Sequence, residues 1–146
     1  MTVYVALLRG VNVGGRGTVD MRELKQQVES LGCSDVSTYI NSGNVIFRDR
    51  RAASTLAREL QRALGRRVAV RSLAQIQALC KRIPAEWTND KEQKTDIGFA
   101  LDEPRDLLWN ARRKDLKPRE GPVWEVDVTA RNVNTVRKLR EKMEAL

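Results

Sequence analysis

The first apolar segment, residues 3–8 (VYVALL), constrains the fold most strongly because it is apolar at every position. A strand of this kind is covered on both faces, whereas a half-exposed strand alternates apolar and polar residues. Residues 9–17 follow at once and hold four of the nine glycines and two arginines. Glycines let backbone N–H groups turn toward a ligand, and arginines add fixed positive charge. We therefore predict a buried strand that leads into an anion-binding loop.

The rest of the first half alternates between helical and strand periodicity. Asp20 and Glu23 have the spacing of a capping box, and Asn41–Asn44 has the composition of a hairpin turn. Gly32 and Gly65 stop the two predicted helices. The patterns predict, in order, a helix over 21–31, strands over 36–40 and 45–47, a helix over 52–64 and a strand over 68–70.

The second half is less regular. Ser72 and Gln75 can form a capping box for a helix that ends before Pro84. Thr129 to Thr135 is a polar run, which we place at the start of the C-terminal helix. We predict a strand over 97–101, a short helix over 104–109, a charged surface loop over 112–121, a half-buried strand over 124–128, and a final helix with Val133, Val136, Leu139, Met143 and Leu146 on one face.

These elements indicate an α+β protein. The order β-α-β-β-α-β is the ferredoxin-like pattern. We expect residues 1–71 to form a ferredoxin-like N-terminal lobe and residues 72–146 to form a second, smaller α/β lobe that includes the C-terminal helix. A chain of 146 residues is long enough to bury a hydrophobic core.

Composition excludes several kinds of chemistry. The chain has no histidine, so no imidazole can serve as a general base or a metal ligand. Its two cysteines, Cys33 and Cys80, are too few for a structural zinc site, and we expect both to be reduced. No apolar run approaches the ~20 residues of a membrane helix. We expect a cytoplasmic protein that binds no metal, cofactor or membrane.

The formal charge of +8 indicates attraction to polyanions or phosphorylated ligands. Residues 1–71 carry 12 basic and 6 acidic side chains, whereas residues 72–146 carry 15 and 13. An arginine-rich surface with no ligand explains this charge equally well. The glycine loop matches neither the P-loop nor the dinucleotide-binding fingerprint, because Gly15 is followed by Arg16-Gly17-Thr18.

Three polar clusters carry the candidate site. They offer amides, hydroxyls, backbone N–H groups and arginines, which bind anions and stabilise negative charge but accept protons poorly at pH 7. A catalytic base would have to come from elsewhere, from Asp96, Asp127 or Tyr39. The candidate ligand-binding residues are Arg9, Gly10, Asn12, Gly14, Gly15 and Arg16, then Asn41, Ser42, Gly43 and Asn44, then Arg131, Asn132, Asn134 and Thr135.

At the same clusters the chain resembles a bacterial family of unknown function, domain of unknown function 1697. The resemblance rests on YVALLRGVNVGG (4–15), MRELKQQVESLG (21–32), STYINSGNVIF (37–47), IPAEWTNDKEQKTDIGF (83–99) and TARNVNTVRKL (129–139). It implies the same two lobes and brings no established activity. Compared with its relatives, the chain looks shorter between Leu101 and Val123.

Three functions remain open from the sequence. The first is a binding module for a phosphate-bearing or other anionic ligand, either nucleic acid or a nucleotide-like metabolite. The second is an enzyme for a small anionic substrate, with the glycine loop and Arg131 as electrostatic stabilisers. The third is a structural or protein-interaction domain. Whether the protein is an enzyme, and its oligomeric state, stay undecided at this stage.

Overall fold

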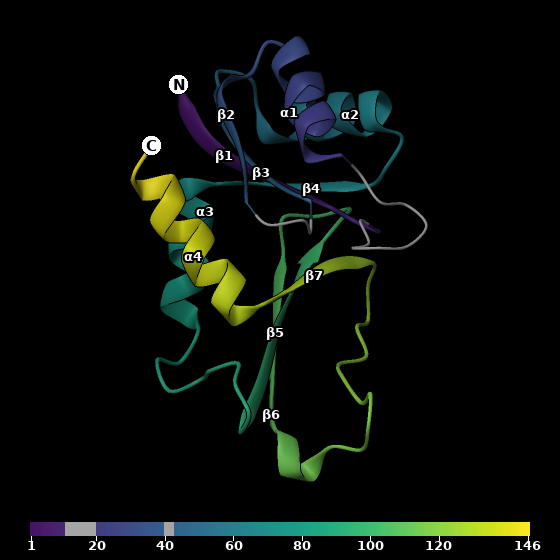
Figure 1. Ribbon diagram of the computed structural model, residues 1–146, viewed down its shortest axis with the longest axis vertical. Helices are drawn as coiled ribbons and strands as arrows, with labels where there is room; N and C mark the ends of the chain where they lie inside the picture. The colour runs from purple at the N-terminus through teal and green to yellow at the C-terminus, as the bar shows by residue number, and fades with distance from the viewer. Residues whose placement is uncertain (11–19, 40–42) are drawn as a thin grey trace.

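The protein has a mixed α+β fold with four helices and two antiparallel sheets among the residues that the structure describes (Figure 1). This computed structural model describes residues 1–10, 20–39 and 43–146. Its elements are β1 (Thr2–Leu8), α1 (Met21–Ser30), β2 (Ser34–Tyr39), β3 (Asn44–Asp49), α2 (Ala53–Leu64), β4 (Val68–Ser72), α3 (Leu73–Arg82), β5 (Gln93–Ala100), β6 (Asp106–Arg112), the 3-10 turn Arg113–Asp115, β7 (Val128–Asn132) and α4 (Val133–Glu144).

The first sheet has the strand order β2-β3-β1-β4, so β1 lies in its interior. One face of β1 packs against α1 and α2 through Ala6 and Leu8. The other face, with Val5 and Leu7, packs against α3, α4 and β5. Figure 1 shows these two helical layers on opposite sides of the sheet. The prediction that residues 3–8 are covered on both faces is confirmed.

The second sheet has the order β6-β5-β7 and lies below the first in Figure 1. Ile97 and Phe99 of β5 point into the core that the two sheets share with α3 and α4. The helix predicted over 104–109 is wrong, because Asp106–Arg112 forms strand β6 opposite β5. Pairing between strands outweighs the local helix-start signal of Pro104.

The strand predicted over 124–128 is also displaced. Trp124 lies outside β7, and its ring is so close to Gly98 that a Cβ there would stand 3.2 Å from it. The tryptophan therefore covers the outer face of β5 instead of joining a ladder. Strand β7 begins at Val128 and includes Arg131, which we had expected at a helix N-terminus.

The predicted helix ends are largely correct. Gly65 ends α2 with a left-handed φ of 64°, and Ser72 and Gln75 form the capping box of α3. At α1, the Asp20 carboxylate accepts from the N–H of Arg22. Within the described ranges, no helix is long and apolar enough to cross a membrane.

Candidate ligand-binding site at the junction of the two sheets

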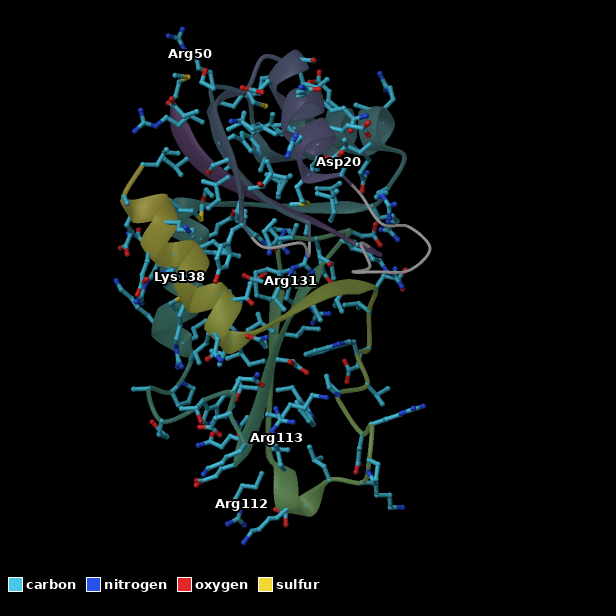
Figure 2. All side chains as sticks on the ribbon, viewed as in Figure 1. Asp20, Arg50, Arg112, Arg113, Arg131 and Lys138 are labelled. Atoms are coloured by element: carbon cyan, nitrogen blue, oxygen red, sulfur yellow. The ribbon has the colours of Figure 1, made fainter. Side chains whose placement is uncertain are left out.

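Arg131 lies between the two sheets, near the middle of the molecule in Figure 2. It stands opposite Ile97 in the second sheet, so its side chain leaves β7 on the inner face. Its Nε donates to Asn44 Oδ1 at 2.8 Å, and its Nη2 donates to the Leu8 carbonyl at 2.9 Å. Its Nη1 donates to Thr129 Oγ1 at 2.7 Å. One guanidinium therefore joins β7 to the ends of β1 and β3.

The same place anchors the ends of two polar segments. The N–H of Leu8 donates to the Gly43 carbonyl at 3.0 Å, and Gly43 has a φ of 76°, which favours glycine. Arg66 Nη1 donates to the Gly10 carbonyl at 3.0 Å. The chain therefore leaves β1 at Leu8 and enters β3 at Asn44, and both of these residues contact Arg131.

Burial lowers the pKa of Arg131 to about 10 because water solvates the guanidinium less well there. At neutral pH the side chain is still protonated. The partners described for it above, and the Ala130 carbonyl at 2.8 Å from Nη1, are neutral oxygens. Arg131 thus brings a positive charge into a half-buried position at the junction.

Three further arginines stand around the end of β1. Arg9 Nη1 lies 3.8 Å from Asp127 Oδ1, and Arg67 Nη1 lies 3.4 Å from Asp127 Oδ2. Arg67 also forms an ion pair with Asp102, and the third arginine is Arg66. The side chains of Arg9 and Asp127 are about half exposed, at 47% and 60%. Exposed pairs of this kind are weak and exchangeable, so Arg9 can turn to an anionic ligand at small cost.

The remaining residues of the third cluster have other roles. Asn132 caps α4 by accepting from the N–H of Thr135 at 3.0 Å. Asn134 Nδ2 donates to the Asn89 carbonyl at 2.9 Å and so holds the segment before β5. Thr135 is itself buried. These three side chains support the structure around β7 and α4.

Six of the predicted ligand-binding residues lie outside the described parts of the chain. For them the sequence prediction stands as it was made, with no structural test. They are Asn12, Gly14, Gly15, Arg16, Asn41 and Ser42.

Of the three candidate bases, Asp96 stands apart from Arg131. It lies opposite Asn132, and therefore on the outer face of the second sheet, while Arg131 leaves the inner face. Burial raises the pKa of Asp96, with Lys94 acting in the opposite direction. Tyr39 carries the Lys142 ammonium 5.1 Å from its ring centroid. Asp127 adjoins the cluster, where it is the ion-pair partner of Arg9.

Sequence reasoning missed Thr129 and the pair Arg66–Arg67 as neighbours of this site. Thr129 Oγ1 donates to the Leu8 carbonyl at 3.2 Å, beside Arg131. The N–H of Arg9 donates to the Arg67 carbonyl at 2.9 Å, because β4 runs antiparallel to β1. The sequence signal that could have identified Arg66 and Arg67 is their position as a basic pair directly before strand β4, which pairs with β1.

A second buried arginine at the junction was missed as well. Arg71 Nε donates to Asp106 Oδ1 at 2.9 Å, and both side chains are almost fully buried. Its Nη2 donates to the Ala100 carbonyl at 2.9 Å. Arg71 therefore ties β4 to the β5–β6 turn. No sequence motif identifies Arg71, because the residue type alone does not show whether an arginine is buried or lies on the surface.

Among the described residues, no group of three or more cysteine, aspartate or glutamate side chains is placed to hold a metal ion. Cys33 and Cys80 are free thiols. Burial raises the pKa of both, that of Cys33 to about 11.

Comparisons with known proteins place the chain in a family. The family described as "Protein of unknown function (DUF1697)" matches residues 1–133. A search of curated proteins found no match. Among solved structures, the conserved bacterial protein SP0830 from Streptococcus pneumoniae is similar, with a TM-score of 0.78 and 23% identity. The likeness covers 97% of this chain and 98% of that one, and it shows a shared fold. Since the family match spans most of its length, the chain belongs to the DUF1697 family of proteins of unknown function.

Proposed function

We propose that the protein is a binding module for a phosphate-bearing ligand, held where the two sheets meet. The observation that carries the proposal is the position of Arg131, whose guanidinium contacts both the end of β1 and the start of β3. Arg131, a half-buried cation, therefore contacts Leu8, directly before the first predicted anion-binding segment, and Asn44, the last residue of the second.

In this proposal the arginines have different tasks. Arg131 has its donors engaged with Asn44, Leu8 and Thr129, so it supplies charge and orientation more than free hydrogen bonds. Arg9, half exposed and only loosely paired with Asp127, contacts the phosphate. Backbone N–H groups of the glycine-rich segment supply the remaining donors, as in other anion-binding nests.

The two alternative functions find less support. A purely structural domain would leave the polar clusters scattered, and against this stand the bonds of Arg131 to Asn44 and to Leu8, the residue that precedes Arg9. An enzyme needs a base at the site; of the candidates, Asp96 lies on the other face of the second sheet, and Asp127 is engaged with Arg9 and Arg67. We also infer a ferredoxin-like unit over residues 1–71 and a smaller lobe over 72–146, since the first six elements follow the β-α-β-β-α-β order.

The test is binding of a fluorescein-labelled single-stranded oligonucleotide, followed by fluorescence anisotropy at several salt concentrations. We expect binding that weakens as salt rises, because bound phosphates release counterions. Competition with inorganic pyrophosphate and with a nucleoside triphosphate separates a small phosphorylated ligand from a nucleic acid. Displacement by the small anions indicates a small ligand, and displacement by unlabelled oligonucleotide alone indicates a polymer.

Arg9→Ala and Arg50→Ala form a matched pair of variants. Both remove one exposed positive charge, but Arg50 lies at the far end of the first sheet from Arg131 (Figure 2). We expect Arg9→Ala to weaken binding roughly tenfold, the effect of one charge-assisted hydrogen bond, and Arg50→Ala to have little effect. Equal losses in both variants, or no binding at low salt, would contradict the proposal.

A further inference from the structure

Each sheet has two edge strands, and at three of these four edges the chain itself occupies or displaces outward backbone groups. Natural proteins protect edges because unpaired N–H and C=O groups invite pairing with another chain. At β2, Asp35 has a φ of 51° and the register shifts between Ser34 and Ser37, which disrupts the edge. At β7, Arg131 Nη1 donates to the outward carbonyl of Ala130.

The edge of β4 is covered by side chains. The outward N–H of Val68 donates to Gln61 Oε1 at 3.0 Å, and the N–H of Ser72 donates to Gln75 Oε1 at 2.8 Å. The outward carbonyl of Val70 accepts from the Arg71 side chain at 3.1 Å. This strand therefore offers few groups to a further strand.

The edge of β6 is different. The N–H of Ala100 donates to the Arg105 carbonyl, and the N–H of Arg113 donates to the Glu92 carbonyl, so the odd-numbered residues of β6 bond to β5. Leu108 and Asn110 therefore direct their N–H and C=O groups outward. Within the described residues no partner occupies these four groups. Residues 107–111 (LLWNA) also lack the charges and prolines that protect edges.

We propose that β6 is the interface of a homodimer, in which it pairs antiparallel with β6 of a second copy. A two-fold axis at Trp109 sets Leu108 against Asn110 of the second copy, and both residues carry outward backbone groups. Trp109 then faces Trp109 of the second copy in a non-hydrogen-bonded pair, where side chains lie closest and aromatic pairs stabilise a sheet. The two three-stranded sheets become one sheet of six strands.

A second copy fits this edge better than an unrelated peptide because the strand complements itself. The same register sets Leu107 against Ala111 of the second copy, so that an apolar pair lies on either side of the axis. A hollow of about 240 Å³ lined by Trp109 and Trp124 lies on one face of the strand. The half-buried Trp109 is thus accessible to a partner at the centre of the pairing.

The first experiment measures mass by light scattering across a concentration series. We expect the mean mass of the wild type to rise from one chain toward two. Trp109→Lys places two ammonium groups opposite each other at the axis and should raise the dissociation constant at least tenfold. The control is Ala52→Lys, which also replaces an exposed apolar residue but lies at the N-cap of α2, on the first sheet and away from β6, and it should dimerise like the wild type.

Cross-linking tests the register even if Trp109→Lys folds poorly. In Trp109→Cys the two new thiols face each other with Cα atoms about 4.5 Å apart, within disulfide range. Oxidation should give a covalent dimer. In Ala111→Cys the two thiols lie on either side of the axis, out of reach, so that variant and the wild type should stay uncross-linked. A wild type that remains monomeric throughout, equal loss in Ala52→Lys, or equal cross-linking in Ala111→Cys would overturn the proposal.

Discussion

One arginine is bound at each end of the first sheet, and these two arginines have different kinds of partners. At one end, Arg51 donates to both carboxylate oxygens of Asp49 at 2.9 and 2.8 Å and forms an ion pair with Glu59. It also donates to the Leu31 carbonyl at 2.7 Å. At the other end, the described partners of Arg131 are neutral oxygens. Arg51 is thus a clamp whose charge is matched by acids, whereas the contacts described for Arg131 tie β7 to the ends of β1 and β3.

The pKa values reflect the same difference. The hydrogen bonds from Arg51 lower the pKa of Asp49 to about 2, and the pair raises the pKa of Arg51. Burial lowers the pKa of Arg131 to about 10. A cation in a carboxylate pair is stabilised within the protein, and a cation that burial destabilises gains most from an anion brought by a ligand. This contrast is why we assign ligand binding to one end of the sheet and structural support to the other.

The largest expected effect comes from removing the clamp. Arg51→Met leaves the Asp49 carboxylate, whose side chain is 5% exposed, without its partner. Stranding one half of a buried pair is strongly destabilising, so we expect a loss of about 4 kcal/mol in the free energy of unfolding. Urea denaturation measures this loss. Arg50→Met, at the exposed neighbouring position, should change the stability by less than about 0.5 kcal/mol.

Acid should reveal the same clamp. The pKa of Asp49 is about 2 in the folded protein against an ordinary value of 3.8, so its contribution to stability is present above about pH 4 and is lost as the pH falls toward 2. The contribution is roughly 2 kcal/mol. Urea titrations between these pH values should show that the wild type loses it, while Asp49→Asn is less stable at pH 7 and changes less. Parallel pH profiles would show that the clamp is not electrostatic.

Arg131→Met should cost less stability than Arg51→Met, about 2 kcal/mol, because the described contacts that it removes are hydrogen bonds to neutral oxygens. Arg131→Lys keeps the charge and loses the planar fork, so it should recover part of this stability. Urea denaturation of both variants tests the comparison directly. If Arg131→Met proved as damaging as Arg51→Met, the two arginines would have to be regarded as equal clamps.

Local patterns predicted most of the first half of the fold. The apolar run over 3–8, the hairpin around Asn44 and the helix stop at Gly65 each depend on a few neighbouring residues, and these were correct. The helix over 104–109 was wrong because residues 107–110 have no helical or strand period of their own and form part of strand β6 by pairing with β5. Strand β7 begins later than the alternating pattern over 124–128 predicts. The reason is that Trp124 packs on Gly98, a residue far away in the sequence, and a local pattern does not reveal such a contact.

The candidate site was predictable in its residue types and much less so in its geometry. The glycines, asparagines and arginines of the polar clusters stood out from their neighbours in the sequence. That Arg131 meets Leu8 and Asn44 follows from how the two sheets pack, which no local pattern encodes. The separate roles of Asn132 and Asn134 also follow from packing, since both are asparagines in the same polar run.

The most direct test of the binding site is an NMR titration of the isotopically labelled protein with inorganic pyrophosphate at low salt. The account predicts saturable shifts in the backbone N–H signals of Gly10, Gly43 and Asn44 and in the Nε–H signal of Arg131. The Nε–H signal of Arg51 should stay in place. Shifts that are absent, or that affect Arg51 as much as Arg131, would contradict the assignment of anion binding to this end of the sheet.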